Sequence, residues 1–552
     1  MPAYALGIAP LLVTLREPNK ATQTTHTTEE PLQTNTAREA AYADDLTGAG
    51  TIDQLKKWWD MVIKYGPFIG YYAKPSKSWL IVKQTHLEYA TQIFAGTGLQ
   101  ITVEGKRHLG AVVGSEQYKL EYVTEKIDQW IDELKMLEKI ARIDPHVAYC
   151  AYVFGIQHRY TYVLRTIPDI TEDLKRLDEA IDNHLIKHLI NKQTFTETER
   201  VWFSLPPRLG GLGIRIPSEI ADTYYNNSRK MTLELVHRIV HQHDSIPPPS
   251  TDKPARAEIE ETKVRQENEK VEWLKEQLSA EQLKLYEAIT EKGAYNWLNA
   301  LPLQEHDFYL DKQKFWDMIQ VRYGLPLQRL PTKCVCDASF TIEHALNCKK
   351  GGFITIRHNN LRDFTADLLS ETCHDVAIEP LLTPLTGEKF QHKTANKDNL
   401  ARLDVSARGA WVKGSRAFFD IRVFNPLAQS YNNQTLKAAH RANEKSKKRE
   451  YAERVLNVEH GSFTPLVFSC FGGTSVECSH FYNKLADKLS EKRDISVSKG
   501  RAWVRTKLSF SLLHSTHMCI RGSRTKRQFA ADTLGTGDTN IQVALLDSMI
   551  KH

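Results

Sequence analysis

The chain has 552 residues, of which 41% are apolar, and a formal net charge of +6 at pH 7. This length predicts about three or four domains with ordinary cores, and no run of about twenty apolar residues predicts a membrane span or membrane partner. Because the net charge is modest, nucleic-acid binding must be argued from local patches. Eight irregularly spaced cysteines and a first segment without a basic start favour an intracellular, reducing compartment over secretion.

The first motif is Tyr42-Ala43-Asp44-Asp45, close to the start of the chain. Two adjacent carboxylates at a tight turn supply the hard oxygen ligands that Mg²⁺ or Mn²⁺ needs in a nucleotidyl-transfer site. Residues 52–65 follow with apolar side chains at helical spacing, and Gly66-Pro67 ends the predicted helix. An exposed Asp-Asp turn without a metal is the alternative interpretation of the motif.

Two strands are predicted after this helix. Residues 77–82 form a turn that leads into an apolar strand, and residues 108–114 form a second strand that ends on glycine. A metal-binding hairpin, a helix, a lysine-bearing segment and a strand in this order resemble the palm of reverse transcriptases. The resemblance implies that the catalytic metal ligands are Asp44 and Asp45, and that Lys77, or else Lys74, lies near the incoming triphosphate. A solvated turn lysine is the alternative for Lys77.

The chain departs from the palm pattern at its start. Such a palm also needs an upstream aspartate and a glycine-rich nucleotide-binding segment, but only 41 residues precede Tyr42. Residues 19–40 are polar and lack the apolar strand expected just before the motif. We therefore expect residues 1–115 to be a partial palm that begins within the domain and has no polymerase activity of its own.

Residues 116–250 are predicted to be helical. The resemblance implies a thumb, which lies along a primer-template duplex and whose Tyr and Trp side chains either fill the core or stack on bases. Residues 205–214 contain glycines that predict a tight turn, and residues 251–330 follow as a charged helical linker. The first helix has apolar residues at three- and four-residue steps, namely Leu120, Val123, Ile127, Trp130, Leu134, Leu137 and Ile140.

A compact metal motif is predicted over residues 331–350. Three soft thiolates and one imidazole within fifteen residues can close a tetrahedral Zn²⁺ site. Both the Cys-x-Cys pair and the His-to-Cys gap are shorter than usual, so a pair of buried thiols with an incidental histidine is the alternative. The candidate ligands are Cys334, Cys336, His344 and Cys348.

A helix, three strands, a helix and a fourth strand are predicted over residues 351–490. This order resembles the core of restriction-like nucleases, which use two acidic groups and a lysine to cleave phosphodiesters with Mg²⁺. The two helices are expected over 353–373 and 436–455, and the strands around 376–379, 402–405, 417–423 and 464–469.

The resemblance implies that Asp404 and Asp420 are the metal ligands of this nuclease. Both lie in short apolar segments, where an unpaired carboxylate is costly without a metal or a basic partner. In the alternative interpretation these aspartates only form ion pairs with Arg402 and Arg422.

The catalytic lysine is not at its usual place in the sequence. Arg422 occupies the position where the Asp-x-Lys pattern has lysine, and arginine is a poor proton carrier because of its very high pKa. A lysine from the 436–455 helix is expected instead, and Lys448 is favoured over Lys447.

Nucleic-acid contacts are expected from basic side chains of the nuclease and of residues 491–552, a basic helix and tail. Around Trp503 and Phe510, these side chains either bind phosphate or belong to an amphipathic helix that caps the nuclease. The candidates are Arg357, His358, Arg422, Arg501 and Arg505, and the basic run extends to Lys526 and Arg527.

Partial palm, thumb, CCHC knuckle and restriction-like nuclease, in this order, resemble the carboxyl-terminal part of a non-long-terminal-repeat retrotransposon polyprotein of the site-specific type. The expected fold is therefore a multidomain combination of α+β and α/β domains. The resemblance implies target-primed reverse transcription, in which the nuclease nicks chromosomal DNA and the polymerase extends the freed 3′ hydroxyl on the element's RNA. The implied partners are a DNA target and the element RNA, and the implied location is the nucleus.

Two functions remain open at this point. The first is a Mg²⁺-dependent DNA-nicking endonuclease joined to an incomplete polymerase. The second is a non-catalytic, zinc-dependent nucleic-acid-binding remnant of a retrotransposon, which the late start of the palm and the arginine at position 422 favour.

Overall fold

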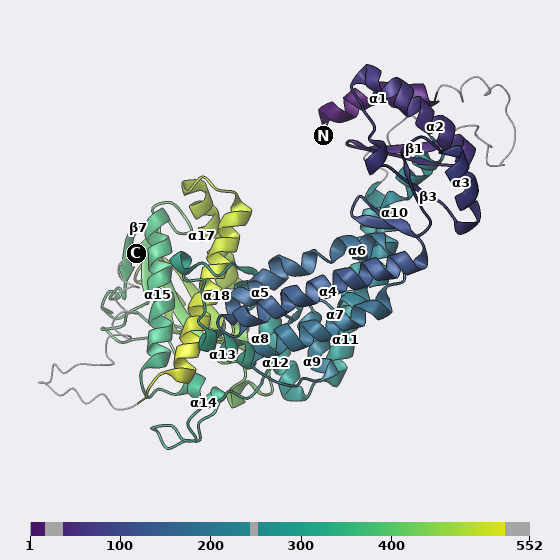
Figure 1. The fold of residues 1–552 in the computed structure, drawn as a ribbon. Coiled ribbons are helices and arrows are strands. Elements are labelled where there is room, and N and C mark those ends of the chain that lie inside the picture. Colours follow the sequence, from purple (N-terminus) through teal and green to yellow (C-terminus); the bar gives the residue numbers. More distant parts are fainter. Residues whose placement is uncertain (1, 17–36, 243–251, 525–552) are drawn as a thin grey trace, which may run out of the picture. The chain divides into compact units, whose positions relative to one another are not determined.

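The computed structural model describes residues 2–16, 37–242 and 252–524 (Figure 1). Over these residues the chain is a helix-rich α+β protein with small sheets, which confirms the predicted mixed fold class at this level. It divides into two compact units, residues 1–325 and 326–552, so the predicted boundary near residue 250 does not separate them. None of the described helices combines the length and apolarity that a membrane span requires.

The amino-terminal part of the first unit contains short helices and three two-stranded sheets. The β1–β2 and β5–β6 pairs are antiparallel, and β3–β4 is parallel. The elements are α1 (Pro2–Arg16), β1 (Arg38–Tyr42), β2 (Asp45–Ala49), α2 (Ile52–Tyr65), β3 (Trp79–Ile81), α3 (Leu87–Ile93), β4 (Gln100–Thr102), β5 (Gly105–His108) and β6 (Ala111–Gly114).

Helix α2 has the predicted bounds because its start and its buried face are both local signals. The Thr51 and Gln54 side chains form a reciprocal capping box at its first turn. Trp59 and Val62 of the predicted apolar face are buried, and Gly66 follows the last residue. A helix whose cap and apolar spacing agree can be placed from sequence alone.

A strand precedes the aspartate motif, although no apolar strand was expected within residues 19–40. This strand is β1, in which the Glu39 carboxylate is buried and burial raises its pKa. Arg16 Nε lies 3.0 Å from Glu39 Oε1, and Trp58 Nε1 donates to Oε2 at 3.1 Å. These two partners compensate the buried Glu39 charge. Because the buried side chain is charged, an apolar pattern in the sequence could not indicate this strand.

The prediction of one strand over residues 108–114 is wrong, because the chain reverses within it. Leu109 and Gly110 have φ of 48° and 81° and join β5 to β6 as a two-residue hairpin. Two consecutive positive φ angles are the signature of a type I′ turn. Tyr122 Oη donates to Gly110 O at 2.7 Å, so a tertiary contact helps to hold a turn that places leucine in an unfavourable conformation.

The rest of the first unit is helical, as predicted, over the described residues. Helix α7 lies beside α4, and α10 packs against α6 and α7 (Figure 1). The helices are α4 (Glu116–Ala141), α5 (Pro145–Phe154), α6 (Thr161–Thr166), α7 (Thr171–Ile181), α8 (Lys187–Ile190), α9 (Glu197–Ser204), α10 (Pro217–Val240), α11 (Asp252–Gln277), α12 (Ala280–Thr290) and α13 (Lys312–Arg322).

Aromatic residues of this part mainly fill its core. Trp130, Tyr149 and Tyr160 are buried, which favours packing over base stacking for these side chains. The glycine-containing segment after α9 forms the predicted tight turn, since a Cβ on Gly211 would lie only 1.8 Å from the Leu205 carbonyl oxygen.

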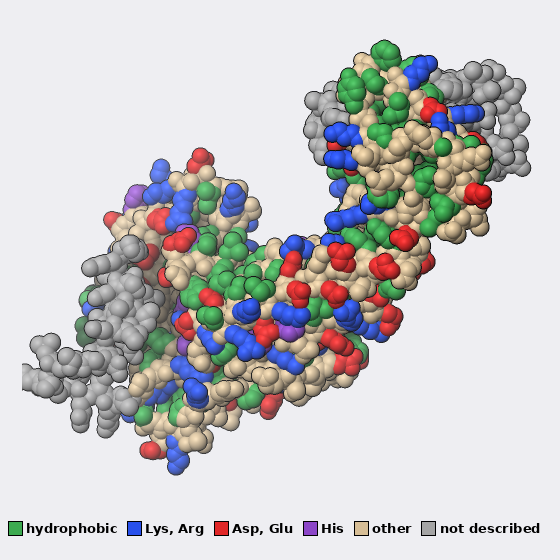
Figure 2. Space-filling model, in the orientation of Figure 1, with side chains coloured by type: hydrophobic (Ala, Val, Ile, Leu, Met, Phe, Trp, Pro, Cys, Tyr) green, Lys and Arg blue, Asp and Glu red, His purple; other side chains and the backbone are tan. Residues whose placement is uncertain are grey.

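Acidic and basic side chains are interspersed over α4 and α7 on the face seen in Figure 2. Many of them are paired across or along helices, as Arg142 is with Glu138 at 2.5 Å and Arg176 with Asp128 at 2.7 Å. This face therefore has no extended field of one sign.

The second unit is built on a four-stranded sheet in the order β10-β9-β8-β7. Strands β7, β8 and β9 are antiparallel, and β10 is parallel to β9, so the predicted order of helix, three strands, helix and strand is confirmed. The elements are α14 (Ile342–Asn347), α15 (Phe353–Thr372), β7 (His374–Ile378), β8 (Val405–Arg408), β9 (Arg416–Phe424), α16 (Leu436–Asn457), β10 (Ser462–Ser469), α17 (Val476–Lys492) and α18 (Val497–Arg521).

Successive residues of β9 face opposite sides of this sheet. Phe419 and Ile421 pack in a core with α15, α17 and α18, whereas Phe418 packs with Tyr451 and Val455 of α16. Because side chains alternate along a strand, Asp420 faces the α16 side. The pleat of β9 thus directs this carboxylate toward the basic helix.

Helix α18 closes the core opposite α16. Its Val504, Leu508 and Leu512 are buried among residues of α15 and α17, and α18 lies beside α15 (Figure 1). Of the two interpretations of the basic carboxyl-terminal segment, the packing supports an amphipathic helix that caps the domain over the described residues. Lys526 and Arg527 lie outside the described residues.

Candidate functional site

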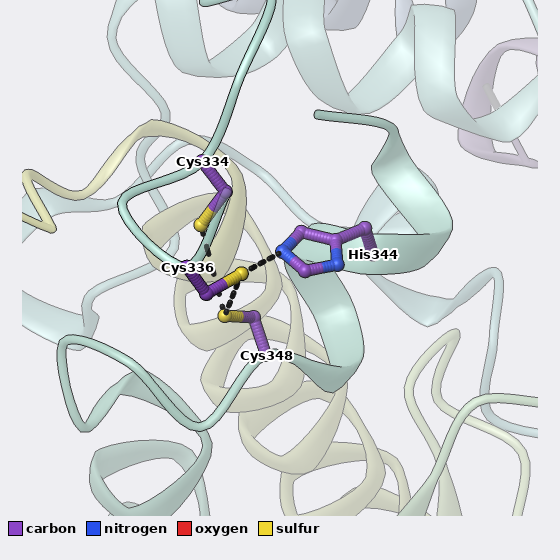
Figure 3. Close-up of side chains that lie close together, drawn as sticks. All are labelled: Cys334, Cys336, His344 and Cys348. Carbon is purple, nitrogen blue, oxygen red and sulfur yellow. Dashed lines mark hydrogen bonds between the residues drawn. The ribbon is translucent and has the colours of Figure 1, made fainter. Parts of the chain in front are cut away.

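The predicted metal knuckle forms a compact loop before α15. Cys334 N donates to Ala338 O at 2.9 Å, and this reversal brings Cys336 toward the short helix α14. Thr341 caps the start of α14, which contains His344 and ends at Cys348. Local hydrogen bonds therefore position all four side chains within one small loop and one helical turn (Figure 3).

The four ligand atoms lie within 4.8 Å of one another. Cys348 Sγ is 3.7 Å from Cys334 Sγ and 3.9 Å from Cys336 Sγ, and Cys336 Sγ is 3.3 Å from His344 Nε2. A tetrahedral zinc ion with ordinary bond lengths requires edges of about 3.8 Å between sulfurs and about 3.5 Å from sulfur to nitrogen. The cluster can therefore bind zinc with little rearrangement.

The protonation of the thiols also suits a metal. Burial works to raise the pKa of Cys334, but a hydrogen bond from the Cys336 backbone and the surrounding ligands lower it to about 6. Burial raises the pKa of Cys348. Zinc would displace the remaining thiol protons, because only the thiolate is a ligand. Within the described part of the chain, no other group of three or more His, Cys, Asp or Glu has this convergence.

The two predicted nuclease aspartates lie at neighbouring strands of the second unit. Asp404 immediately precedes β8 and its backbone N–H donates to Phe419 O at 3.1 Å, which places it beside β9. Asp404 Oδ2 accepts a hydrogen bond from the Ile421 backbone and lies 3.1 Å from His358 Nε2. His358 was expected to contact nucleic acid, whereas here it holds a carboxylate.

Asp420 is the more buried of the two carboxylates, with 8% of its side chain exposed. Its Oδ2 lies 3.0 Å from Lys447 Nζ of α16, although it accepts no hydrogen bond of good geometry. Burial raises the pKa of Asp420 to about 6, the Lys447 charge opposes this, and the nearby Asp404 charge adds to it. A buried carboxylate whose ionisation a second carboxylate disfavours is a common feature of divalent-metal and acid–base sites.

Of the two candidate lysines, the geometry selects Lys447 and not Lys448. Lys448 instead pairs with Glu477 at the start of α17. Consecutive helical residues point about 100° apart, so only one of them can face the sheet. Burial would lower the pKa of Lys447, but Asp420 outweighs it and the pKa is raised. The sequence contained a signal for this choice. Lys447 lies four residues before the buried Tyr451, so helical spacing places both on the same side of α16.

The alternative pairing of the aspartates with neighbouring arginines does not occur. Arg402 Nη1 donates to Glu379 O at 2.9 Å. Arg422 is exposed and forms no ion pair with any described residue. Arg357, a predicted nucleic-acid contact, is only 4% exposed and Nη2 donates to Leu346 O at 3.3 Å, so it joins α15 to α14 instead of reaching a ligand.

The other predicted nucleic-acid contacts on α18 are engaged within the domain. Arg501 forms two hydrogen bonds of 2.6 Å with the Asp487 carboxylate, and Arg505 donates to Asn483 Oδ1 at 2.8 Å. Both acceptors belong to α17. These arginines fasten the two helices together, which reduces their availability for phosphate.

The amino-terminal aspartates have a different setting. Ala43 and Asp44 form the turn between β1 and β2, and both Asp44 and Asp45 are exposed. Lys77 is exposed at the end of a short 3₁₀ turn. Among the described residues, neither aspartate forms an ion pair, and Lys77 contacts neither of them.

No protein-family model matches this chain, and no curated protein matches it either. The geometry of the chain is therefore the basis for a functional conclusion. It offers two converged chemical groups in the second unit, the Cys₃His cluster and the Asp404–Asp420–Lys447 group with His358.

Proposed function

We propose that this chain is a metal-dependent endonuclease that nicks DNA, derived from a non-long-terminal-repeat retrotransposon polyprotein. The observation that supports it is the meeting of Asp404, Asp420 and Lys447 on a core of one helix, three strands, a helix and a strand. In this proposal the first unit descends from a reverse transcriptase and is inactive alone. A DNA target and element RNA are the partners, and the nucleus is the location.

The donor set suits Mg²⁺ or Mn²⁺. Asp420 Oδ2 is a buried oxygen that forms an ion pair with Lys447 but accepts no hydrogen bond of good geometry, and Asp404 Oδ2 is already engaged by His358 and Ile421. Asp404 Oδ1 and the Asp420 carboxylate are thus the atoms left to hold a hard cation. When bound, such a cation would stabilise the charge that develops on a phosphate during hydrolysis.

The residues of the chain would divide the remaining work. Lys447 places a positive charge beside Asp420, where it can stabilise the negative charge of a phosphate under attack. His358 fixes the orientation of Asp404 through its Nε2 contact. Because the Lys447 pKa is raised, its ammonium is charged at neutral pH and acts as an electrostatic group.

A plasmid assay tests this proposal. Purified full-length protein should convert supercoiled DNA to the nicked form in Mg²⁺ and not in EDTA. Asp404→Ala and Asp420→Ala should each abolish nicking while DNA binding, measured by fluorescence anisotropy, is retained. Undiminished nicking by both variants would refute the assignment.

A second candidate function is zinc-dependent binding of nucleic acid without cleavage. It is favoured by the contacts of the two aspartates, since each has a basic neighbour, His358 or Lys447, that compensates its charge. It predicts salt-sensitive binding that is lost when zinc is removed, with no nicking in Mg²⁺ or Mn²⁺. Cleavage that depends on Asp420 would exclude it.

A further inference from the structure

The outer face of α16 has a row of exposed basic side chains. Lys437, Arg441 and Lys445 follow one another at four-residue steps, so they lie along one side of the helix over about 12 Å. None of the three forms an ion pair or side-chain hydrogen bond with any described residue. They differ in this from the paired cations of α4 and α7.

The acidic residues of α16 do not neutralise this row. Glu444 accepts a hydrogen bond from Glu477 N at the start of α17, and Glu450 lies 3.8 Å from Lys447 Nζ. Glu453 accepts hydrogen bonds from the backbone of Gln391 and His392. Among the described residues, none of these carboxylates forms an ion pair with Lys437, Arg441 or Lys445.

This arrangement is unfavourable for the helix itself. Like charges four residues apart repel each other, and Lys437 lies in the first turn, where the helix dipole also disfavours a cation. No described carboxylate offsets the repulsion. A charge pattern that weakens its own helix points to an anionic ligand outside the chain.

The shape of the surface fits an extended anion. A shallow groove follows the row, and small alanine side chains lie between the basic ones, so a polymer backbone can approach the helix closely. The lining residues are Thr435, Lys437, Ala438, Arg441, Ala442 and Lys445.

We propose that this row, the α16 basic row (Lys437, Arg441 and Lys445), binds the phosphodiester backbone of a nucleic acid, with about one phosphate for each cation. The inference rests on the proposed function for its class of ligand and adds a second surface to it. Lys447 points about 120° away from Arg441 around the helix axis. The row therefore binds a segment away from the phosphate that the aspartates would cleave.

The test measures how salt weakens binding. Anisotropy titrations of labelled duplex DNA and of labelled single-stranded RNA are carried out over a series of KCl concentrations, with wild type and a Lys437→Gln/Arg441→Gln/Lys445→Gln variant. Each lost phosphate contact should lower the slope of log Kd against log [KCl] by about 0.9 for duplex DNA and about 0.7 for a single strand. The slope for the triple variant should thus be lower by about 2.7 with duplex DNA and by about 2.1 with single-stranded RNA.

A matched control removes the same charge from paired positions. Lys135 and Lys175 are exposed helical lysines and Lys275 is a partly exposed one, and each lies beside a carboxylate three residues earlier. Their triple Gln variant should keep the wild-type slope. The basic-row variant should also unfold at the same temperature as wild type or a higher one, since it removes repulsion. An Arg/Lys exchange at the three positions should retain the slope.

The outcomes separate the two proposals. A slope change with DNA alone, RNA alone or both supports the basic row and identifies its ligand. If the basic-row variant has the same slope as the control variant with both nucleic acids, the proposal for the basic row is overturned, even if the wild-type protein nicks DNA. Absent nicking by wild type refutes the endonuclease, while the salt slopes still test the row.

Discussion

Two pairs of aspartates in this chain have the same composition and opposite surroundings. Asp44 and Asp45 are adjacent in sequence, exposed at a hairpin turn and without an ion-pair partner among the described residues. Asp404 and Asp420 are sixteen residues apart, lie just before β8 and within the neighbouring β9, and have His358 and Lys447 beside them. The first pair is easier to recognise as a motif in the sequence. Only the second pair has basic side chains next to its carboxylates.

The difference shows what a metal site requires beyond carboxylates. An exposed carboxylate is well solvated and loses little if no metal binds. A buried one costs free energy unless a cation or a proton compensates it, and the raised pKa of Asp420 reports that cost. Burial together with a fixed cation is the feature that distinguishes the second pair.

The largest expected effect comes from the same substitution made at each pair. Asp404→Asn/Asp420→Asn should lower the rate of plasmid nicking by about 10³-fold or more, because it removes the charges that would hold the metal. Asp44→Asn/Asp45→Asn should leave the rate within about twofold. Equal losses in gel assays of both variants would break the comparison.

The next largest effect is expected at the Cys₃His cluster, where four side chains from one short segment lie close enough to bind one metal ion. Cys348→Ala should lower zinc affinity by more than about 10²-fold, since it removes one of four direct ligands. Zinc content is measured by mass spectrometry after dialysis against a competing chelator. Cys373→Ala removes a buried thiol outside the cluster, and zinc retention by this control together with loss in Cys348→Ala is the required result.

Adjacent lysines provide a sharper version of the same contrast. Lys447→Gln should slow nicking by about 10²-fold, because it removes the cation beside Asp420. Lys448→Gln should change it by less than about twofold, since this side chain pairs with Glu477. Single-turnover nicking rates decide between them, and a larger loss from Lys448→Gln would contradict the geometry.

The stability of the protein should depend on pH through Asp420. Its pKa is about 6 in the folded chain and 3.8 ordinarily, so the folded state binds more protons than the unfolded state between these values. Stability from this group is therefore present below about pH 4 and lost as pH rises through 6. In Mg²⁺-free urea unfolding, Asp420→Asn should reduce this pH-dependent loss of stability by about 3 kcal/mol.

The exposed pair supplies the control for this titration. Asp45→Asn should leave the pH profile of stability parallel to that of wild type, because the side chain lies at an open turn. Effects of pH on the thiols of the cluster are common to both variants and cancel in the difference. A flat wild-type profile between pH 4 and 7 would show that the Asp420 pKa is not raised.

The smallest effect concerns the turn of the first pair. Ala43 has a φ of 52°, a conformation that costs alanine more than glycine. Ala43→Gly should therefore change stability by less than about 1 kcal/mol, with the release of strain offset by greater freedom of the unfolded chain. Thermal unfolding measures this, and a loss above about 2 kcal/mol would mean that the methyl group has a packing role.

Features that depend on nearby residues follow from the sequence. The bounds of α2 follow from its capping residues and apolar spacing, and the four ligands of the cluster lie within fifteen residues. The order of helix, three strands, helix and strand in the second unit is also predicted correctly. The hairpin at Leu109–Gly110 is missed, because its leucine has a positive φ and the turn is held by tertiary hydrogen bonds from Tyr162 to Leu109 O and from Tyr122 to Gly110 O.

Contacts between distant residues are decided by tertiary structure. His358 and Asp404 are 46 residues apart, and Asp420 and Lys447 are 27 apart. The choice of Lys447 depends on how α16 is rotated against the sheet. The hydrogen bonds of Arg357, Arg501 and Arg505 within the domain depend on their partners in α14 and α17.

The sequence by itself thus determined which residue types are available and where the regular elements begin. Only the tertiary structure decided which carboxylates are buried, which lysine faces them and which cations of α16 have no ion-pair partner among the described residues. The physical reason is that propensity and capping act over a few residues, whereas burial and charge pairing depend on elements that meet across the sheet.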